Sequence, residues 1–275
     1  MSSSRAGIRV TVAAILLMAA ALLFGPELQS PDRSPHPPPA PLPLQIAAAS
    51  DLRFALEELT AGYRGTSPMV SPAVTYGSSG TLYAQILNGA PFDLFMSADT
   101  AYPMRLATHG LTLAGSEFTY AIGRLAVWVP AASSLDVEKT GLQVLVDPGV
   151  MHVAMANPAT APYGRAAEAA MRRAAVYERA RTKIVLGENV AQALQFVQSG
   201  AADVGVIAMS LAVAPTVRGT GRYWPIPLDF YPHMDQGGVI LKTDAIDQAR
   251  DFRRYLLSDA GRDVLKRYGF YGSDN

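Results

Sequence analysis

The chain has 275 residues, of which 49% are hydrophobic and 17% are charged, so it can bury a substantial core. Its 23 basic and 23 acidic side chains cancel, which gives no sign of a nucleic-acid-binding surface. Cysteine is absent, which excludes disulfides, thiolate metal sites, a cysteine nucleophile and a lipid-modified N-terminal cysteine.

The first 43 residues predict export to the periplasm. Arg5 and Arg9 precede an uncharged, mostly apolar run from Val10 to Phe24, and about 15 residues suit a signal-peptide core better than a membrane span. We therefore expect a signal peptide over residues 1–25 and an extended, proline-rich linker over residues 26–43. No clear cleavage site follows the apolar run, so an uncleaved membrane tether is the alternative.

The following elements alternate between short apolar strands and amphipathic helices. Leu52, Leu56, Leu59 and Tyr63, for example, recur at helical spacing. We expect strands at 44–49, 74–76, 93–97 and 204–207, and helices over 52–63, 82–88 and 190–199. Such alternation predicts an α/β fold with parallel sheets flanked by helices.

Two stretches of the chain resemble each other. The helix over 82–88 ends at Gly89 and leads through Asp93 into an apolar strand, and the helix over 190–199 ends at Gly200 and leads through Asp203 into another. Each glycine stands where a helix C-cap is expected. One such unit in each half is typical of two similar α/β lobes, although chance similarity is the alternative.

The motifs of common enzymes are missing from the sequence. It contains no G-x-S-x-G elbow, no phosphate-binding P-loop and no H-E-x-x-H pair. Its four histidines are scattered, and we assign none of them a role: His36, His109, His152 and His233. We therefore expect a protein that is not an enzyme and that needs no cofactor.

Small polar residues instead mark four predicted strand-to-helix junctions. They lie at Ser50, at Ser78-Ser79, at residues 157–165 and at residues 187–190. A helix N-terminus presents unpaired N–H groups and the positive end of the helix dipole, so it can bind an anion without a formal charge. Serine is also a common N-cap, so any single junction has a purely structural explanation. Four junctions, two in each half, indicate a cleft lined by helix N-termini.

Five segments resemble the periplasmic molybdate-binding proteins of ABC importers. They are AAASDLRFALEEL, YGSSGTLYAQILNGAPFDLFMSAD, NPATAPYGRAAEAA, GENVAQALQFVQSGAADVGVIA and DVLKRYGF, and they follow the family order from about Leu44 to Phe270. The resemblance implies a type II periplasmic-binding fold with two lobes, a two-strand hinge and a ligand cleft between the lobes. The ligand it implies is molybdate or tungstate, held through its oxygens without direct metal ligands, and the partner it implies is an inner-membrane permease.

The resemblance also implies the site residues. Hydroxyl donors would come from Ser50 and Ser79, and backbone N–H donors from Tyr163 and Val190. Ser78 and Asp51 are possible additional contacts.

Two positions depart from the family pattern. Many members have a ligand-binding tyrosine where this chain has Ala208, and others have an asparagine where it has Asp51. We expect the Asp51 carboxylate to turn away from the cleft toward its own helix N-terminus. If it instead points inward, it favours a protonated ligand such as hydrogen phosphate or a phosphonate, because a carboxylate accepts hydrogen bonds and repels a dianion.

The lobe boundaries follow from the same pattern. We expect lobe 1 to contain residues 44–122 and 230–275 and lobe 2 residues 123–229, in a monomer. Three alternatives stay open: a protein for another oxyanion, a periplasmic enzyme on the same fold, and a membrane-tethered oxyanion sensor.

Overall fold

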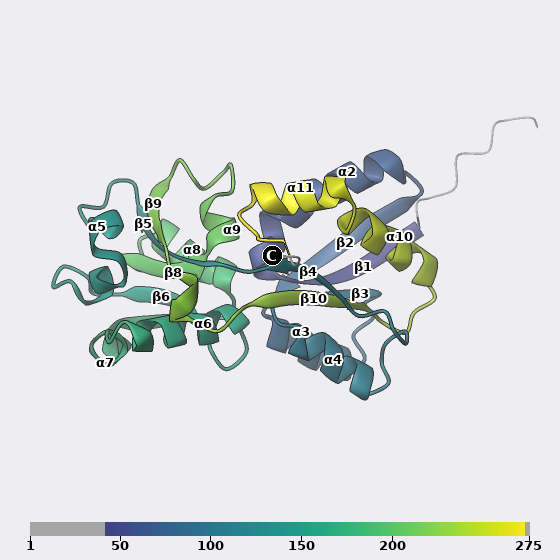
Figure 1. The fold of residues 1–275 in the computed structure, drawn as a ribbon, viewed down its shortest axis with the longest axis horizontal. Coiled ribbons are helices and arrows are strands. Elements are labelled where there is room, and N and C mark those ends of the chain that lie inside the picture. The colour runs from purple at the N-terminus through teal and green to yellow at the C-terminus, as the bar shows by residue number, and fades with distance from the viewer. Residues whose placement is uncertain (1–41, 273–275) are drawn as a thin grey trace, which may run out of the picture. The chain divides into compact units, whose positions relative to one another are not determined.

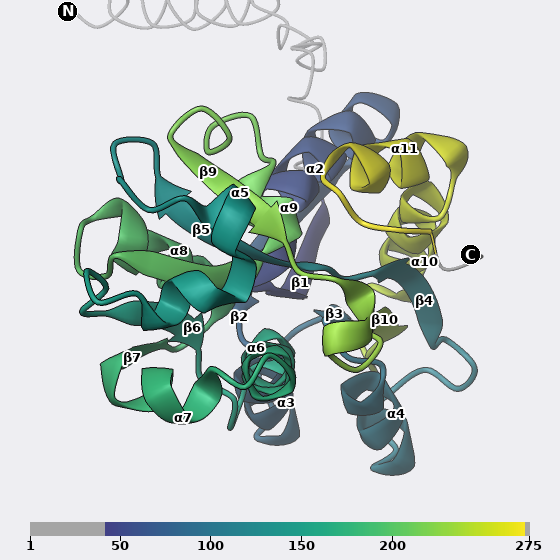
Figure 2. The same ribbon diagram turned by 60° about the vertical axis from the view of Figure 1, so that its left-hand side comes forward.

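The computed structural model describes residues 42–272 (Figures 1 and 2). The predicted signal peptide and nearly all of the predicted linker lie outside the described residues, so both stay predictions. Within residues 42–272, no helix combines the length and apolar character that a membrane span requires.

The first of two five-stranded sheets has the order β2-β1-β3-β10-β4. Strand β1 is parallel to β2 and β3, whereas β10 is antiparallel to β3 and β4. The strands are β1 (Leu42–Ala49), β2 (Val70–Gly77), β3 (Leu94–Ser97), β4 (Phe118–Ile122) and β10 (Asp235–Ile240). The accompanying helices are α2 (Arg53–Thr66), α3 (Ser79–Leu87), α4 (Ala101–Thr108), α10 (Ile246–Leu256) and α11 (Asp259–Arg267). Figure 1 shows α3 and α4 below this sheet and α2, α10 and α11 above it.

The second sheet has the order β7-β6-β8-β5-β9. Its strands are β5 (Leu125–Pro130), β6 (Val153–Ala156), β7 (Ile184–Gly187), β8 (Val204–Ala208) and β9 (Gly221–Pro225). Its helices are α5 (Val137–Thr140), α6 (Pro162–Arg173), α7 (Tyr177–Ala180), α8 (Val190–Gln198) and α9 (Met209–Ala212). Short 3-10 helices occur at Ser50–Leu52, Gly141–Val146, Arg181–Lys183 and Leu228–Phe230.

These two sheets confirm the predicted α/β fold with two lobes. The sheets are also equivalent in topology, because β6 is parallel to both neighbours, as β1 is, and β5 is antiparallel to β8, as β10 is to β3. The repeated sequence unit becomes α3–β3 in one lobe and α8–β8 in the other. Gly89 and Gly200 follow the two helices with φ of 84° and 78°, a left-handed conformation that glycine adopts without steric cost.

The core of the first lobe follows from side-chain alternation along its central strands. Ala47, Phe95 and Val239 share one face and pack with α3 and α4. Alternate residues of the same strands, such as Ile46 and Leu94, join the larger core on the opposite face. Both faces of this sheet are therefore covered, which explains why β1 and β3 are almost entirely apolar.

The chain crosses between the sheets twice, at residues 123–124 and over residues 226–234. The first crossing lies against the C-terminal end of the described chain: Tyr271 and Ile122 exchange backbone hydrogen bonds, and the Arg124 guanidinium stacks 4.4 Å from the Tyr271 ring centroid. The Tyr231 hydroxyl accepts a hydrogen bond from the Leu125 N–H at 3.2 Å, which ties the two crossings together. The predicted lobe boundaries stay a prediction.

One boundary differs from the sequence-based expectation. Strand β1 begins at Leu42, two residues before the predicted strand start at Leu44, because Leu42 and Pro43 extend the parallel register with Val70 and Ser71 of β2. Proline lacks the N–H that a strand interior needs, which made the linker appear longer in the sequence.

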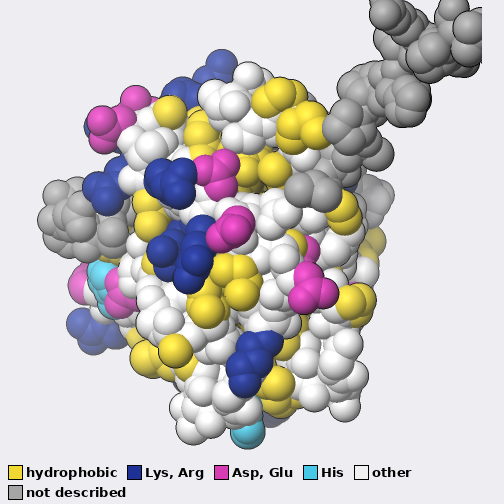
Figure 3. All heavy atoms as spheres, turned by 90° about the vertical axis from the view of Figure 1, so that its right-hand side faces the viewer, with side chains coloured by type: hydrophobic (Ala, Val, Ile, Leu, Met, Phe, Trp, Pro, Cys, Tyr) yellow, Lys and Arg dark blue, Asp and Glu magenta, His cyan; other side chains and the backbone are white. Residues whose placement is uncertain are grey.

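Charges of both signs are mixed on the end of the first lobe that Figure 3 shows. On α10, which lies in this lobe, Arg254 pairs with Asp251 and Arg250 with Asp247. These short-range pairs agree with the balanced composition.

Candidate functional site

All six residues predicted for the site line one small cavity between the lobes. Its lining residues are Ala49, Ser50, Asp51, Gly77, Ser78, Ser79, Ala98, Ala161, Pro162, Tyr163 and Val190. They come from the ends of β1, β2 and β3 and from the first turns of α3, α6 and α8. The cavity thus lies at the carboxyl ends of strands, where open α/β sheets bind ligands.

Ser50 is not the helix N-cap that the sequence suggested. It begins the 3-10 helix Ser50–Leu52, and the α-helix that follows has Leu52 at its N-cap without a side-chain cap. The β1 strand runs directly into this tight turn, so the Ser50 hydroxyl is not used by its own helix. Its oxygen instead accepts the Ala191 N–H at 3.4 Å, from α8 of the other lobe. That bond leaves the hydroxyl hydrogen to be donated elsewhere.

The two serines at the start of α3 have different roles. Ser78 is the N-cap: its oxygen accepts the Thr81 N–H at 3.2 Å and its hydroxyl lies 2.8 Å from the Thr81 hydroxyl. The Ser79 oxygen accepts the buried Ala98 N–H at 3.0 Å, so the Ser79 hydroxyl hydrogen is free to donate into the cavity. Ser78 therefore builds the helix terminus, whereas Ser79 can also present a donor.

Tyr163 and Val190 each occupy the first turn of a helix. Tyr163 follows Pro162 at the start of α6, and Val190 is the first residue of α8. Amides in these positions have no carbonyl of their own helix to bond. The Asn189 side chain caps α8 by accepting the Ala191 and Gln192 N–H groups at 3.1 Å, which leaves the Val190 N–H uncapped.

Asp51 forms hydrogen bonds with side chains of both lobes. Its Oδ2 accepts the Gln236 side-chain N–H at 2.7 Å, and the same Gln236 nitrogen lies 3.0 Å from the Tyr163 hydroxyl. The Asp51 carbonyl accepts the Ser210 hydroxyl at 2.7 Å. Since Tyr163 and Ser210 belong to the second lobe, this buried cluster joins the lobes.

Burial dominates the ionisation of this cluster. It raises the pKa of Asp51 to about 6, although hydrogen bonds from Gln236, from Tyr163 and from the N–H groups of Asp51 and Leu52 oppose the rise. Burial and the nearby Asp51 carboxylate raise the pKa of Tyr163 well above 10, so its hydroxyl stays protonated and can act as a donor.

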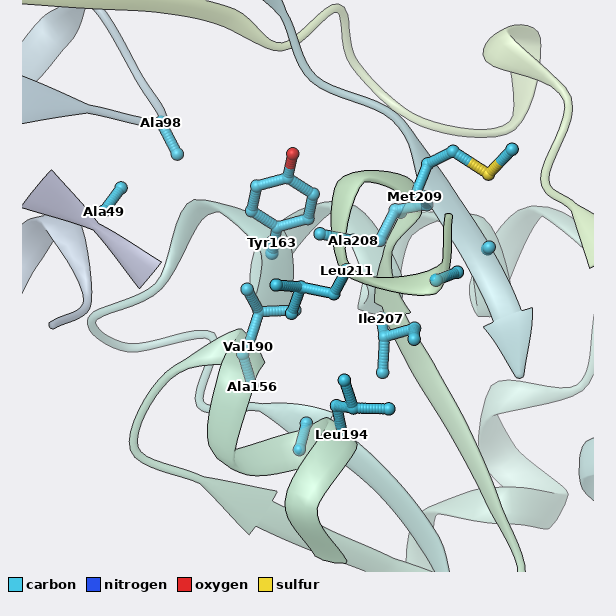
Figure 4. Close-up of a cluster of buried hydrophobic side chains, with 14 of the residues drawn as sticks. Ala49, Ala98, Ala156, Tyr163, Val190, Leu194, Ile207, Ala208, Met209 and Leu211 are labelled. Carbon is cyan, nitrogen blue, oxygen red and sulfur yellow. The ribbon is translucent and has the colours of Figure 1, made fainter. Parts of the chain in front are cut away.

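Apolar side chains support the cavity from the second lobe. Figure 4 shows the Tyr163 ring among Val190, Ala208 and Leu211, with its hydroxyl directed away from Val190 and Leu211. Ala208 is fully buried at the end of β8, so this position supplies no hydroxyl.

The lining suits a small anion that needs no countercharge. None of the described residues that line the cavity is a lysine, arginine or histidine. The cavity volume is only about 10 Å³, so we expect the lobes to part when a tetrahedral ion enters. Among residues 42–272, no group of three or more histidine, aspartate or glutamate side chains could hold a metal ion.

Two contributors to the site were missed in the sequence. Gln236 is fully buried in β10 and bonds to Asp51, and the Ala98 N–H bonds to Ser79. The signal for Gln236 was a polar residue followed by two glycines at the start of an apolar run. The Ala98 N–H left no sequence signal.

Comparison with known proteins settles the family. Residues 44–271 match the family described as bacterial extracellular solute-binding protein. The chain belongs to this family. Extracellular solute-binding proteins are exported and are not an enzyme family, which agrees with the predicted export and confirms the resemblance found in the sequence.

Named relatives within this family are similar over most of their length. The molybdate-binding protein ModA of Rhodobacter capsulatus is 38% identical over 200 residues, which cover 72% of this chain and 77% of the relative. The Azotobacter vinelandii ModA is 34% identical over 229 residues, covering 82% and 89%. The solved structure of the A. vinelandii periplasmic molybdate-binding protein aligns with a TM-score of 0.76 at 32% identity, covering 82% of this chain and 98% of that chain.

Proposed function

We propose that this protein is the substrate-binding component of a molybdate ABC transporter. It captures the tetrahedral oxyanion between its lobes and delivers it to a permease in the inner membrane. Relatives named for molybdate binding, at 34–38% identity, support this assignment. It acts as a periplasmic monomer without catalytic activity, and tungstate, with nearly the same size and charge, is a second ligand.

The observation that carries the proposal is the convergence of neutral donors on one cavity. The Ser50 and Ser79 hydroxyls each accept a backbone N–H and thus have a hydrogen to donate, and the amides of Tyr163 and Val190 lie in first helical turns. Neutral donors of this kind suit a fully deprotonated ion such as molybdate. Cavity size then selects against the smaller sulfate.

The direction of Asp51 supports the same ligand. The Oδ2 of its carboxylate is bonded to Gln236, and the N–H groups of Asp51 and Leu52 also stabilise its charge. In this arrangement the Asp51 side chain serves the lobe junction. The alternative of a hydrogen phosphate or phosphonate ligand needs an inward carboxylate, which these contacts oppose. A membrane-tethered sensor would depend on residues 1–41, outside the described residues.

The test is isothermal titration of purified residues 42–275 with molybdate, tungstate, sulfate and phosphate at neutral pH. We expect tight one-to-one binding of molybdate and tungstate and no heat from sulfate or phosphate. Binding of phosphate without molybdate would overturn the assignment and place the Asp51 carboxylate in the site.

A further inference from the structure

A single arginine of the second lobe joins two groups of the first lobe. Arg165 lies on α6, and its Nη2 donates to the carboxylate of Asp99 at 2.6 Å. Asp99 lies in the loop that follows β3. Its Nη1 lies 3.3 Å from the Tyr102 hydroxyl of α4, and its guanidinium is 5.8 Å from the Tyr102 ring centroid. These contacts exist only while the lobes are together.

The first lobe holds Asp99 in place before Arg165 reaches it. The Asp99 N–H donates to the Ser97 hydroxyl at 3.1 Å, and that hydroxyl donates to the Asp99 carbonyl at 2.7 Å. The Asp99 Oδ1 accepts the Ala101 N–H at 2.9 Å, leaving Oδ2 for the guanidinium. An ion pair with one preorganised partner loses less side-chain entropy when it forms.

The ion pair stands beside the oxyanion cavity. Arg165 and Asp99 both line a cavity of about 260 Å³ that shares Ala98 and Pro162 with the oxyanion cavity. This larger cavity adjoins the oxyanion cavity and is lined from both lobes, so we take it as the mouth of the cleft. Its remaining charged or titratable lining residues are Asp235 and His233, whose carboxylate and imidazole lie 3.1 Å apart. Two carboxylates and one guanidinium thus face the path of an incoming anion.

We propose that Arg165 and Asp99 form a latch across the mouth of the cleft, which slows release of the bound oxyanion and masks a carboxylate that would repel it. The ligand in this statement rests on the proposed function, whereas the contact between the lobes does not. Neither residue lines the oxyanion cavity itself. Arg165 therefore affects the rates of oxyanion binding and release by holding the lobes together and by changing the electrostatic field at the mouth of the cleft.

Two variants separate the two effects. Arg165→Gln and Asp99→Asn both remove the latch, so both should accelerate dissociation. The Arg165 and Asp99 side chains are 43% and 30% exposed, so water screens the ion pair. We therefore expect dissociation to accelerate by no more than about fivefold. Association should change in opposite directions: Arg165→Gln leaves two carboxylates facing the dianion and slows capture, whereas Asp99→Asn frees the guanidinium and speeds it.

The experiment measures both rate constants on the full mature chain with radiolabelled molybdate, at low and at high salt. Arg172→Gln is the matched control, because Arg172 lies on the same helix and pairs with Glu168 at 2.8 Å within one lobe. We expect faster release from both latch variants, unchanged release from the control, and an association difference that salt abolishes. Release from Arg165→Gln or Asp99→Asn at the wild-type rate would overturn the latch, and so would equal association rates in the two variants.

A ligand-independent readout keeps this inference apart from the proposed function. The Gly80 N–H donates across the lobes to the Thr160 carbonyl at 2.9 Å, so its exchange with deuterated solvent reports lobe separation. We expect faster exchange at Gly80 in both latch variants without ligand and no change in Arg172→Gln. Wild-type protein that fails to bind molybdate would overturn the proposed function alone, whereas unchanged Gly80 exchange in the latch variants would overturn the latch alone.

Discussion

The side-chain nitrogen of Gln236 lies 2.7 Å from a carboxylate oxygen of Asp51, and both side chains are fully buried. Gln236 stands in β10, the strand that the chain enters after its second crossing between the sheets. Its nitrogen also contacts the Tyr163 hydroxyl from the second lobe. The charge state of Asp51 therefore affects the fold, the lobe junction and the ligand together.

The first prediction concerns stability and pH. Burial raises the pKa of Asp51 from 3.8 to about 6, so the protonated form is favoured in the folded state. The raised pKa of Asp51 adds to the free energy of unfolding at low pH. This contribution is fully present below pH 4 and is lost as the pH rises through 6, by about 3 kcal/mol in total. Asp51→Asn should lack this part of the pH dependence. Urea unfolding of both proteins from pH 4 to pH 7.5 measures the difference, and parallel curves would contradict it.

The second prediction concerns affinity and pH. The Asp51 carboxylate adjoins the oxyanion cavity, so protonating it removes a like charge beside a dianion. Between pH 7.5 and 5.5, wild-type affinity for molybdate should rise by about tenfold, which corresponds to about 1.4 kcal/mol. Asp51→Asn should bind more tightly than wild type at pH 7.5 and change little with pH. Weaker binding by Asp51→Asn at both pH values would show that the carboxyl group itself holds the ligand.

The third prediction separates a ligand-binding serine from a structural one. Ser79→Ala removes a donor from the cavity and leaves the Ala98 N–H without its partner, whereas Ser116→Ala removes hydrogen bonds to the Ile240 backbone away from the site. Each variant should lose about 1–3 kcal/mol of stability. Only Ser79→Ala should also lose molybdate affinity, by about ten- to hundredfold. Calorimetry and urea unfolding measure the two effects, and equal affinities in the two variants would remove Ser79 from the site.

The fourth prediction uses glycine at the lobe contact. A Cβ at Gly80 would lie 2.6 Å from the Thr160 carbonyl oxygen and 2.9 Å from the Tyr102 hydroxyl, so Gly80→Ala should hold the lobes apart and weaken binding by at least about tenfold. Because alanine favours helices, the thermal stability should not fall with the affinity. Gly65→Ala in α2 is the control, since a Cβ there meets no atom within 4 Å. Wild-type affinity in Gly80→Ala would mean that the lobes bind ligand without this close approach.

Much of the site was predictable because strand-to-helix junctions are local. The junctions at Ser78-Ser79, 157–165 and 187–190 follow from where apolar runs stop and helices begin, and the two sheets follow from the same alternation. The choice of Ser79, Tyr163 and Val190 within those junctions came from the family resemblance. Gln236 and the ion pair of Arg165 with Asp99 were not predictable in this way, because they depend on how the lobes meet. Ser50 was placed at the correct junction with the wrong local role, since only the structure shows a 3-10 turn before α2.

The contact of Tyr271 with the first crossing has a practical consequence for reporter proteins. A sensor for oxyanions needs a fluorescent domain whose attachment leaves ligand-driven motion intact. Tyr271 exchanges backbone hydrogen bonds with Ile122 and stacks on Arg124. These two residues are the immediate neighbours of Gly123. A fusion that pulls on the C-terminus would thus load the first crossing between the sheets, which is the pivot expected for closure of the lobes. An insertion at the exposed turn that ends α4, near Gly110, would leave this pivot untouched.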